Sequence, residues 1–179
     1  MRKALSGILL GILSFMFIIL TTGTSNADVA GLKVTRVGYN AVGADTYMNR
    51  NSEYVDITAS VTTDVKDLIV TDSWGHVNNA DGVGCNAYKV TTLPGGVGST
   101  DGTGTGTFLL ANHTLRVYVG YGRPAASDSY HYLYMNSDYR QCGYNGHFIN
   151  NMGDTLWITK GTTESDSFSF DIRRGYYVR

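Results

Sequence analysis

Two stretches of the chain alternate apolar and polar residues with the two-residue period of a half-buried β-strand. One spans residues 51–58 and the other spans residues 153–159. The apolar positions that share a face in these stretches are Val55, Ile57, Leu156 and Ile158. We expect both stretches to be core strands of one domain built from β-sheet.

Further strands are expected between turn signals rich in glycine, asparagine and aspartate. They lie at residues 32–37, 65–71, 87–91, 115–120, 130–134 and 167–172. In the first of them the apolar face switches at Arg36 and Val37, which predicts a bulge, and residues 130–134 are expected at a sheet edge. Residues 72–76 are expected to form a turn. Within residues 28–179 no apolar spacing of three and four residues persists over ten residues. This part of the chain is therefore predicted to be all-β, an immunoglobulin-like antiparallel β-sandwich with a closed barrel as the alternative.

A tract from Pro94 to Thr107 contains mostly glycine, serine and threonine and has few apolar side chains to bury. Because strands resume directly after it, the tract is predicted to be a flexible Gly-rich loop at 94–107 and not a domain boundary. Residues 28–179 are therefore expected to form a single domain, which is long enough for a full hydrophobic core.

The first 27 residues have the pattern of a secretory signal peptide. A basic start at Arg2 and Lys3 leads into an apolar segment, and the small residues Ser25, Asn26 and Ala27 follow. An uncleaved membrane anchor is the alternative, but the apolar segment is at the short end for a membrane span. Removal of residues 1–27 leaves 12 basic and 15 acidic residues, a net charge of −3. This balance argues against a nucleic-acid partner, and secretion to the extracellular space is expected.

Two cysteines, Cys85 and Cys142, remain in the exported chain, where oxidation is permitted. They are predicted to form one disulfide, which would close a loop of roughly 57 residues and contribute about 4 kcal/mol on the loop-entropy model. Two free thiols used for metal or redox chemistry are the alternative, although no CxxC spacing supports it.

Four short motifs stand in an order that resembles the lamin-tail domain in its exported bacterial form. They occupy residues 51–57, 72–76, 115–123 and 150–155. The resemblance covers about residues 30–160 and implies an immunoglobulin-like sandwich that acts as an interaction module. Members of that family occur alone or beside hydrolases and nucleases in exported bacterial proteins. The chain departs from the family pattern at Ile149, in the Gly-rich tract and after residue 160.

Three motif residues are predicted to have structural roles. Gly153 suits a turn that needs a positive φ, and the Asp154 side chain can accept backbone N–H bonds there. Glu53, at the head of its strand, is expected to bond loop backbone groups or to pair with Arg50 or Arg116. A lone glutamate without a second positioned carboxylate is a poor acid/base catalyst.

Histidines and loop aspartates do not form a recognisable metal or catalytic motif. The histidines His76, His113, His131 and His147 lie on separate segments without zinc-site spacing, and each is expected at the surface or in a turn. The loop aspartates Asp72, Asp81 and Asp101 leave a calcium site open, although no twelve-residue calcium loop is present. We therefore expect no catalytic residues, no metal and no cofactor. A small metal-dependent hydrolase that uses Asp72, His76 and His147 is the alternative.

Tyrosine is unusually frequent, with 13 in the chain. Some are expected to fill the core or cover edge strands. Others offer rigid area with a polar tip, which suits stacking on glycans or peptides. The candidate binding surface consists of Tyr121, Tyr130, Tyr132 and Tyr134.

Together these patterns predict a secreted lamin-tail-like domain that acts as an extracellular binding or structural module. Its partner is expected to be an extracellular protein or a component of the cell envelope. An inhibitor or immunity-type protein that uses the Gly-rich tract as its contact is a further alternative.

Overall fold

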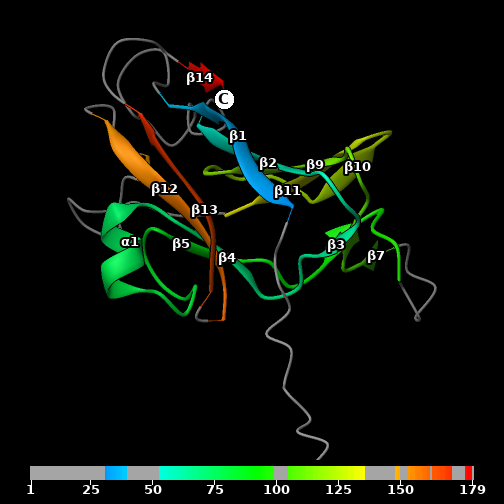
Figure 1. Ribbon diagram of the computed structural model, residues 1–179, viewed down its shortest axis with the longest axis horizontal. Helices are drawn as coiled ribbons and strands as arrows, with labels where there is room; N and C mark the ends of the chain where they lie inside the picture. The colour runs from blue at the N-terminus through cyan, green and yellow to red at the C-terminus, as the bar shows by residue number, and fades with distance from the viewer. Residues whose placement is uncertain are drawn as a thin grey trace, which may run out of the picture.

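The computed structural model describes residues 31–39, 53–98, 105–135, 148–149, 153–161, 163–170 and 176–178. The larger sheet has six strands, in the order β10 (Ala125–Ser127), β11 (Tyr130–Tyr134), β9 (Thr114–Tyr118), β2 (Tyr54–Ala59), β1 (Leu32–Gly38) and β14 (Tyr176–Val178). The smaller sheet has four, in the order β13 (Thr163–Phe170), β12 (Asp154–Lys160), β4 (Leu68–Thr71) and β5 (Ala87–Lys89). The fold is therefore all-β, as predicted (Figure 1).

Two smaller pairs and one short helix complete the described elements. The pairs are β3 (Thr63–Asp64) with β8 (Phe108–Leu109) and β6 (Leu93–Pro94) with β7 (Thr105–Gly106). The helix α1 (Ser73–Asn78) contacts β12 and β4 of the four-stranded sheet, and Figure 1 shows it beside that sheet.

The core lies between the two sheets. The four apolar residues predicted to face inward are all fully buried, at 0% exposure: Val55, Ile57, Leu156 and Ile158. The first two belong to the six-stranded sheet and the last two to the four-stranded sheet, and all four join one hydrophobic cluster. The two stretches with the clearest alternation thus form strands β2 and β12, which lie in opposite sheets of a sandwich.

The strand pairings refine two of the predictions for the six-stranded sheet. The register of β1 against β2 shifts between Val34 and Arg36, which confirms a bulge near the predicted position. The prediction that residues 130–134 form an edge strand is wrong, because β10 pairs along the outer side of β11. On its inner side β11 runs parallel to β9, whereas the other described strand pairs are antiparallel.

Residues 73–78 form a short helix where the sequence analysis predicts only a turn. Asp72 is the N-cap, and its carboxylate accepts a hydrogen bond from the Gly75 backbone N–H at 2.6 Å. Gly75 allows the helix to lie against the chain that enters β5, since a Cβ there would be 1.8 Å from the carbonyl oxygen of Asn86. A helix of this length is too short to show a helical period in the sequence.

The ends of the Gly-rich tract are ordered by pairing. Leu93 and Pro94 pair with Gly106 and Thr105, and Val97 forms a bridge with Phe108. The backbones approach so closely that a Cβ on Gly106 would be 2.2 Å from the carbonyl oxygen of Val97. Glycine permits this close backbone contact. The prediction of a flexible loop therefore does not describe either end of the tract, where the backbone is paired. Residues 99–104 lie outside the described residues.

Several predictions concern residues beyond the described part. The signal peptide at 1–27 and the second cysteine, Cys142, are among them, so cleavage and the disulfide stay predictions. The described residues include no free cysteine. Near the C-terminus, β14 pairs antiparallel with β1, although this segment follows no pattern of the resembled family. No helix in the described ranges is long and apolar enough to span a membrane.

Candidate binding surface

Tyrosines from three neighbouring strands gather on the outer face of the six-stranded sheet. Strand alternation directs Val55, Ile57, Leu115, Val117 and Leu133 into the core, so the residues between them face outward. The strand registers place these outward residues side by side: Tyr54 opposite Tyr118, Tyr118 opposite Tyr134, and Arg116 opposite both Asp56 and Tyr132. We call the surface formed by Tyr54, Tyr118, Tyr130, Tyr132 and Tyr134, with Asp56 and Arg116, the tyrosine face.

A partly buried ion pair lies at the centre of the tyrosine face. Arg116 Nε donates to Asp56 Oδ1 at 2.6 Å and Arg116 Nη2 donates to Asp56 Oδ2 at 2.7 Å, so the pair is bidentate. The side chains of Arg116 and Asp56 are only 17% and 4% exposed. The hydrogen bonds to Asp56 raise the pKa of Arg116 above its ordinary value. Because the carboxylate neutralises the guanidinium, the centre offers hydrogen-bond donors without net charge.

The guanidinium of Arg116 also holds the surrounding rings in place. Its carbon Cζ lies 3.9 Å from the centre of the Tyr54 ring, 5.8 Å from that of Tyr118 and 5.5 Å from that of Tyr130. Each distance is within the range of a cation–π contact. One side chain thus links tyrosines on three strands.

The rings also contact one another. The Tyr118 and Tyr134 rings are nearly parallel, with centroids 5.0 Å apart, and the Tyr130 and Tyr132 rings are 5.9 Å apart at 13°. Tyr118 further contacts Tyr132 at 6.3 Å. Burial, with smaller contributions from Tyr118 and Tyr132, raises the pKa of the Tyr134 hydroxyl.

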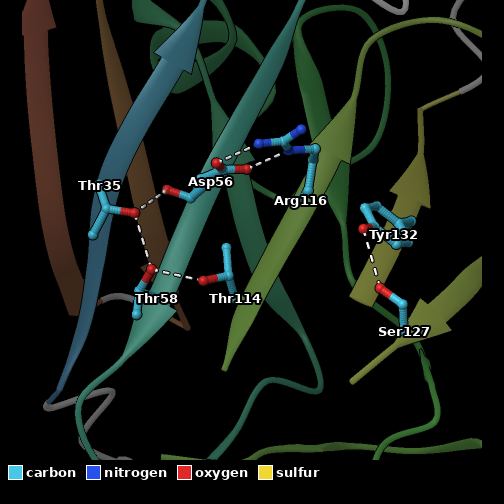
Figure 2. A network of polar contacts seen from close by, with 7 residues as sticks. All are labelled: Thr35, Asp56, Thr58, Thr114, Arg116, Ser127 and Tyr132. Atoms are coloured by element: carbon cyan, nitrogen blue, oxygen red, sulfur yellow. Dashed lines mark hydrogen bonds and ion pairs between the residues drawn. The ribbon is translucent and has the colours of Figure 1, made fainter. Parts of the chain in front are cut away.

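A row of hydroxyl groups runs across the sheet beside the ion pair, as Figure 2 shows. Thr35 Oγ1 is 2.9 Å from Thr58 Oγ1, which is 3.0 Å from Thr114 Oγ1. At the other side of the face the Tyr132 hydroxyl lies 3.2 Å from Ser127 Oγ. The tyrosine face therefore combines aromatic rings with hydroxyl groups that both donate and accept hydrogen bonds.

Three of the four tyrosines predicted as a binding surface come together here, namely Tyr130, Tyr132 and Tyr134. Tyr121 lies beyond the end of β9 and is 40% exposed. Its neighbour Gly122 packs against the Tyr134 ring, where a Cβ would be 2.2 Å from a ring carbon.

Sequence reasoning missed Asp56 and Arg116 as the centre of the surface. Both residues occupy outward positions of alternating strands. This alternation was the feature of the sequence from which an outward position could have been inferred for each.

The predicted structural motif residues are placed as follows. Gly153 has a φ of 101°, which confirms the need for glycine at this turn. Asp154 Oδ1 accepts hydrogen bonds from the backbone N–H groups of Thr155 at 2.7 Å and Ser73 at 3.3 Å, and from Ser73 Oγ at 2.7 Å. Glu53 is buried at 4% exposure, and its carbonyl accepts from Val119 N–H. The carboxylate that holds Arg116 in the structure is Asp56.

Two of the three residues named for a hydrolase, Asp72 and His76, have other partners in the structure. Asp72 caps α1, and its Oδ2 accepts from Asn86 Nδ2 at 2.5 Å. Burial of its carboxyl group, and to a smaller extent the nearby charge of Asp154, raises the pKa of Asp72 to about 7. The His76 ring stacks on Trp157, with centroids 4.3 Å apart. His147 and Asp101 lie outside the described residues.

The prediction that every histidine lies at the surface or in a turn is wrong for His131, which is 3% exposed in β11. Alternation places it on the opposite face of that strand from the tyrosines on either side. Its ring lies 3.1 Å from that of His113, measured between His131 Nε2 and His113 Nδ1.

Comparisons of the chain with models of protein families, with curated proteins and with solved structures found no match. The resemblance to the lamin-tail domain therefore stays a prediction from the motifs.

Proposed function

We propose that the chain is a secreted, lamin-tail-like β-sandwich that acts as an extracellular binding module, and that the tyrosine face is its binding surface. The observation that supports this proposal is the gathering of five tyrosines from three strands around one neutralised arginine. Each of these rings is only partly buried, so ring area and hydroxyl groups remain accessible to a partner.

The chemistry of the face favours a hydroxyl-rich polymer of the cell envelope as the partner. Tyrosine rings offer apolar area to the C–H faces of sugars, and their hydroxyls bond to sugar hydroxyls. Arg116 contributes donors but no net charge, because Asp56 neutralises it. A highly charged ligand such as DNA would gain little from such a centre, since phosphate binding depends on uncompensated basic residues.

The experiment is co-sedimentation of the purified protein with insoluble cell-wall polysaccharide, with membrane vesicles and DNA as parallel arms. We expect the protein to pellet with the polysaccharide and not with DNA. Tyr132→Ala and Tyr130→Ala should each weaken binding by about tenfold, as expected for aromatic residues at the centre of an interface. Tyr132→Phe separates the ring from its hydroxyl, since it keeps the first and removes the second.

Trp74→Ala is the matched control, because Trp74 is an aromatic residue with 37% exposure on α1, away from the six-stranded sheet. It should bind as the unmodified protein does. Pelleting with no envelope fraction, or binding that survives both tyrosine substitutions, would overturn the proposal.

A further inference from the structure

His113 and His131 form a pair of imidazoles that no part of the proposed binding surface uses. His131 is in β11, and His113 lies just before β9, which runs parallel to β11. The backbone fixes His113, since its N–H donates to the Leu110 carbonyl at 3.0 Å and its carbonyl accepts from Ala59 N–H at 3.1 Å. His131 is 3% exposed, whereas His113 is partly exposed. The pair therefore has one buried member and one member within reach of solvent.

The hydrogen bonds determine which nitrogens carry protons. His131 Nδ1 lies 2.7 Å from the carbonyl oxygen of Pro94, and a carbonyl only accepts, so Nδ1 must be the donor. In neutral His131 the remaining nitrogen, Nε2, then has a lone pair and accepts from His113 Nδ1–H at 3.1 Å. The lone pair of a buried imidazole is thus directed at a second imidazole.

We propose that His113 Nδ1 and His131 Nε2 form a binding site for a divalent transition-metal ion such as Cu²⁺, Ni²⁺ or Zn²⁺. Imidazole suits these ions. Histidine ligands of metals usually donate their other ring N–H to a carbonyl or carboxylate, and the His131–Pro94 bond has this form. Within the described residues no group of three or more His, Cys, Asp or Glu side chains gathers, so the site proposed here has two protein ligands from this part of the chain.

Metal binding requires the hydrogen-bonded pair to open. Two nitrogens bound to a tetrahedral metal at about 2.0–2.1 Å are about 3.3 Å apart, close to the 3.1 Å between these two. The ring centroids are 5.4 Å apart, so the two nitrogens face each other head-on along the line that joins them. An ion bound to both nitrogens lies beside that line, so one ring must rotate and shift before both can bind it. His113 is the ring that moves, because Pro94 and burial hold His131. Its proton shifts to Nε2, which leaves the pair neutral.

The experiment is calorimetric titration of the untagged protein with Cu²⁺, Ni²⁺ and Zn²⁺ in separate runs. We expect one ion per chain, with Cu²⁺ bound more tightly than Zn²⁺, as the general order of affinities predicts. His113→Asn should weaken binding by at least about tenfold, because an amide nitrogen is no metal ligand. Its amide nitrogen is attached to Cγ, as Nδ1 is, and its N–H can still donate to His131 Nε2, so the melting temperature of the ion-free protein should stay nearly the same.

His76→Gln is the matched control, and it should bind Cu²⁺ as the unmodified protein does. Nitrogen NMR of the imidazoles, recorded with and without Zn²⁺, should show shifts at His113 Nδ1 and His131 Nε2. The proposal is overturned by the lack of saturable binding of all three ions up to about 1 mM. Equal affinity of His113→Asn and the unmodified protein would also overturn it.

Discussion

Two aspartates of the described residues are buried, Asp56 on strand β2 and Asp72 directly after strand β4, and they have opposite surroundings. Asp56 on β2 is 3% exposed and receives both hydrogen bonds of a bidentate arginine. Asp72 at the start of α1 is 2% exposed but has a backbone N–H and an asparagine amide as donors, with Asp154 nearby. Burial alone disfavours the charged form of a carboxyl group, and a nearby cation favours it. Whether a cation lies beside the carboxylate therefore decides whether the cost of its burial is compensated.

The largest effect is expected when Asp56 loses its cation. Arg116→Met keeps most of the aliphatic stem and leaves a buried carboxylate without a counter-charge. We expect a loss of about 3–5 kcal/mol in the free energy of unfolding, measured by urea denaturation at pH 7. The tyrosine rings that contact the guanidinium should also change their near-ultraviolet circular dichroism.

The double variant Asp56→Asn with Arg116→Met tests the cause of that loss. If an uncompensated charge is responsible, removal of the carboxylate should restore most of the stability, because a neutral amide costs less to bury. A double variant as unstable as Arg116→Met alone would instead assign the loss to the missing cation–π contacts.

The second effect concerns Asp72 and depends on pH. Its pKa is raised to about 7 by burial, so between about pH 4 and pH 7 the folded protein holds a proton that the unfolded chain has released. The free energy of unfolding should therefore fall as pH rises through this window. Asp72→Asn keeps a good N-cap and removes the ionisation, so it should stabilise the protein by about 1–2 kcal/mol at pH 8 and change little at pH 4.

Asn86 makes this substitution acceptable, because rotation of its amide turns an oxygen toward the amide introduced by Asp72→Asn. Thermal unfolding at pH 4, 6 and 8 is the measurement. Destabilisation of equal size at all three pH values would contradict the argument, since it would mean that the helix needs the ionised carboxylate.

The two sites differ in how far the sequence could predict them. Alternation alone correctly identified Val55, Ile57, Leu156 and Ile158 as inward, because that signal is local. The partner of Arg116 depends on β2 lying beside β9, a pairing between residues about 60 positions apart that no local pattern encodes. The sequence analysis accordingly named Arg116 only as one alternative partner for Glu53 and did not link it to Asp56, which binds it in the structure.

Other parts of the structure were beyond local reasoning for related reasons. Helix α1 has only six residues, so Asp72 resembled an ordinary loop aspartate. The contact of His113 with His131 follows from the parallel register of β11 and β9, and parallel pairing has no short turn to reveal it. The outward tyrosines of β11 were predictable because three of them alternate within five residues.

The smallest effect is expected at an exposed ion pair. Comparison with this pair shows how much of the stability lost in Arg116→Met depends on the burial of Asp56. Lys89 Nζ lies 3.3 Å from Asp67 Oδ1, and the two side chains are 39% and 52% exposed. Lys89→Met retains the stem, which packs near Gly82, and removes only the charge. Water already solvates both partners, so we expect a change below about 0.5 kcal/mol in the free energy of unfolding, measured by urea denaturation with and without added salt. A loss as large as that of Arg116→Met would mean that proximity of opposite charges, and not their removal from water, sets the strength of both pairs.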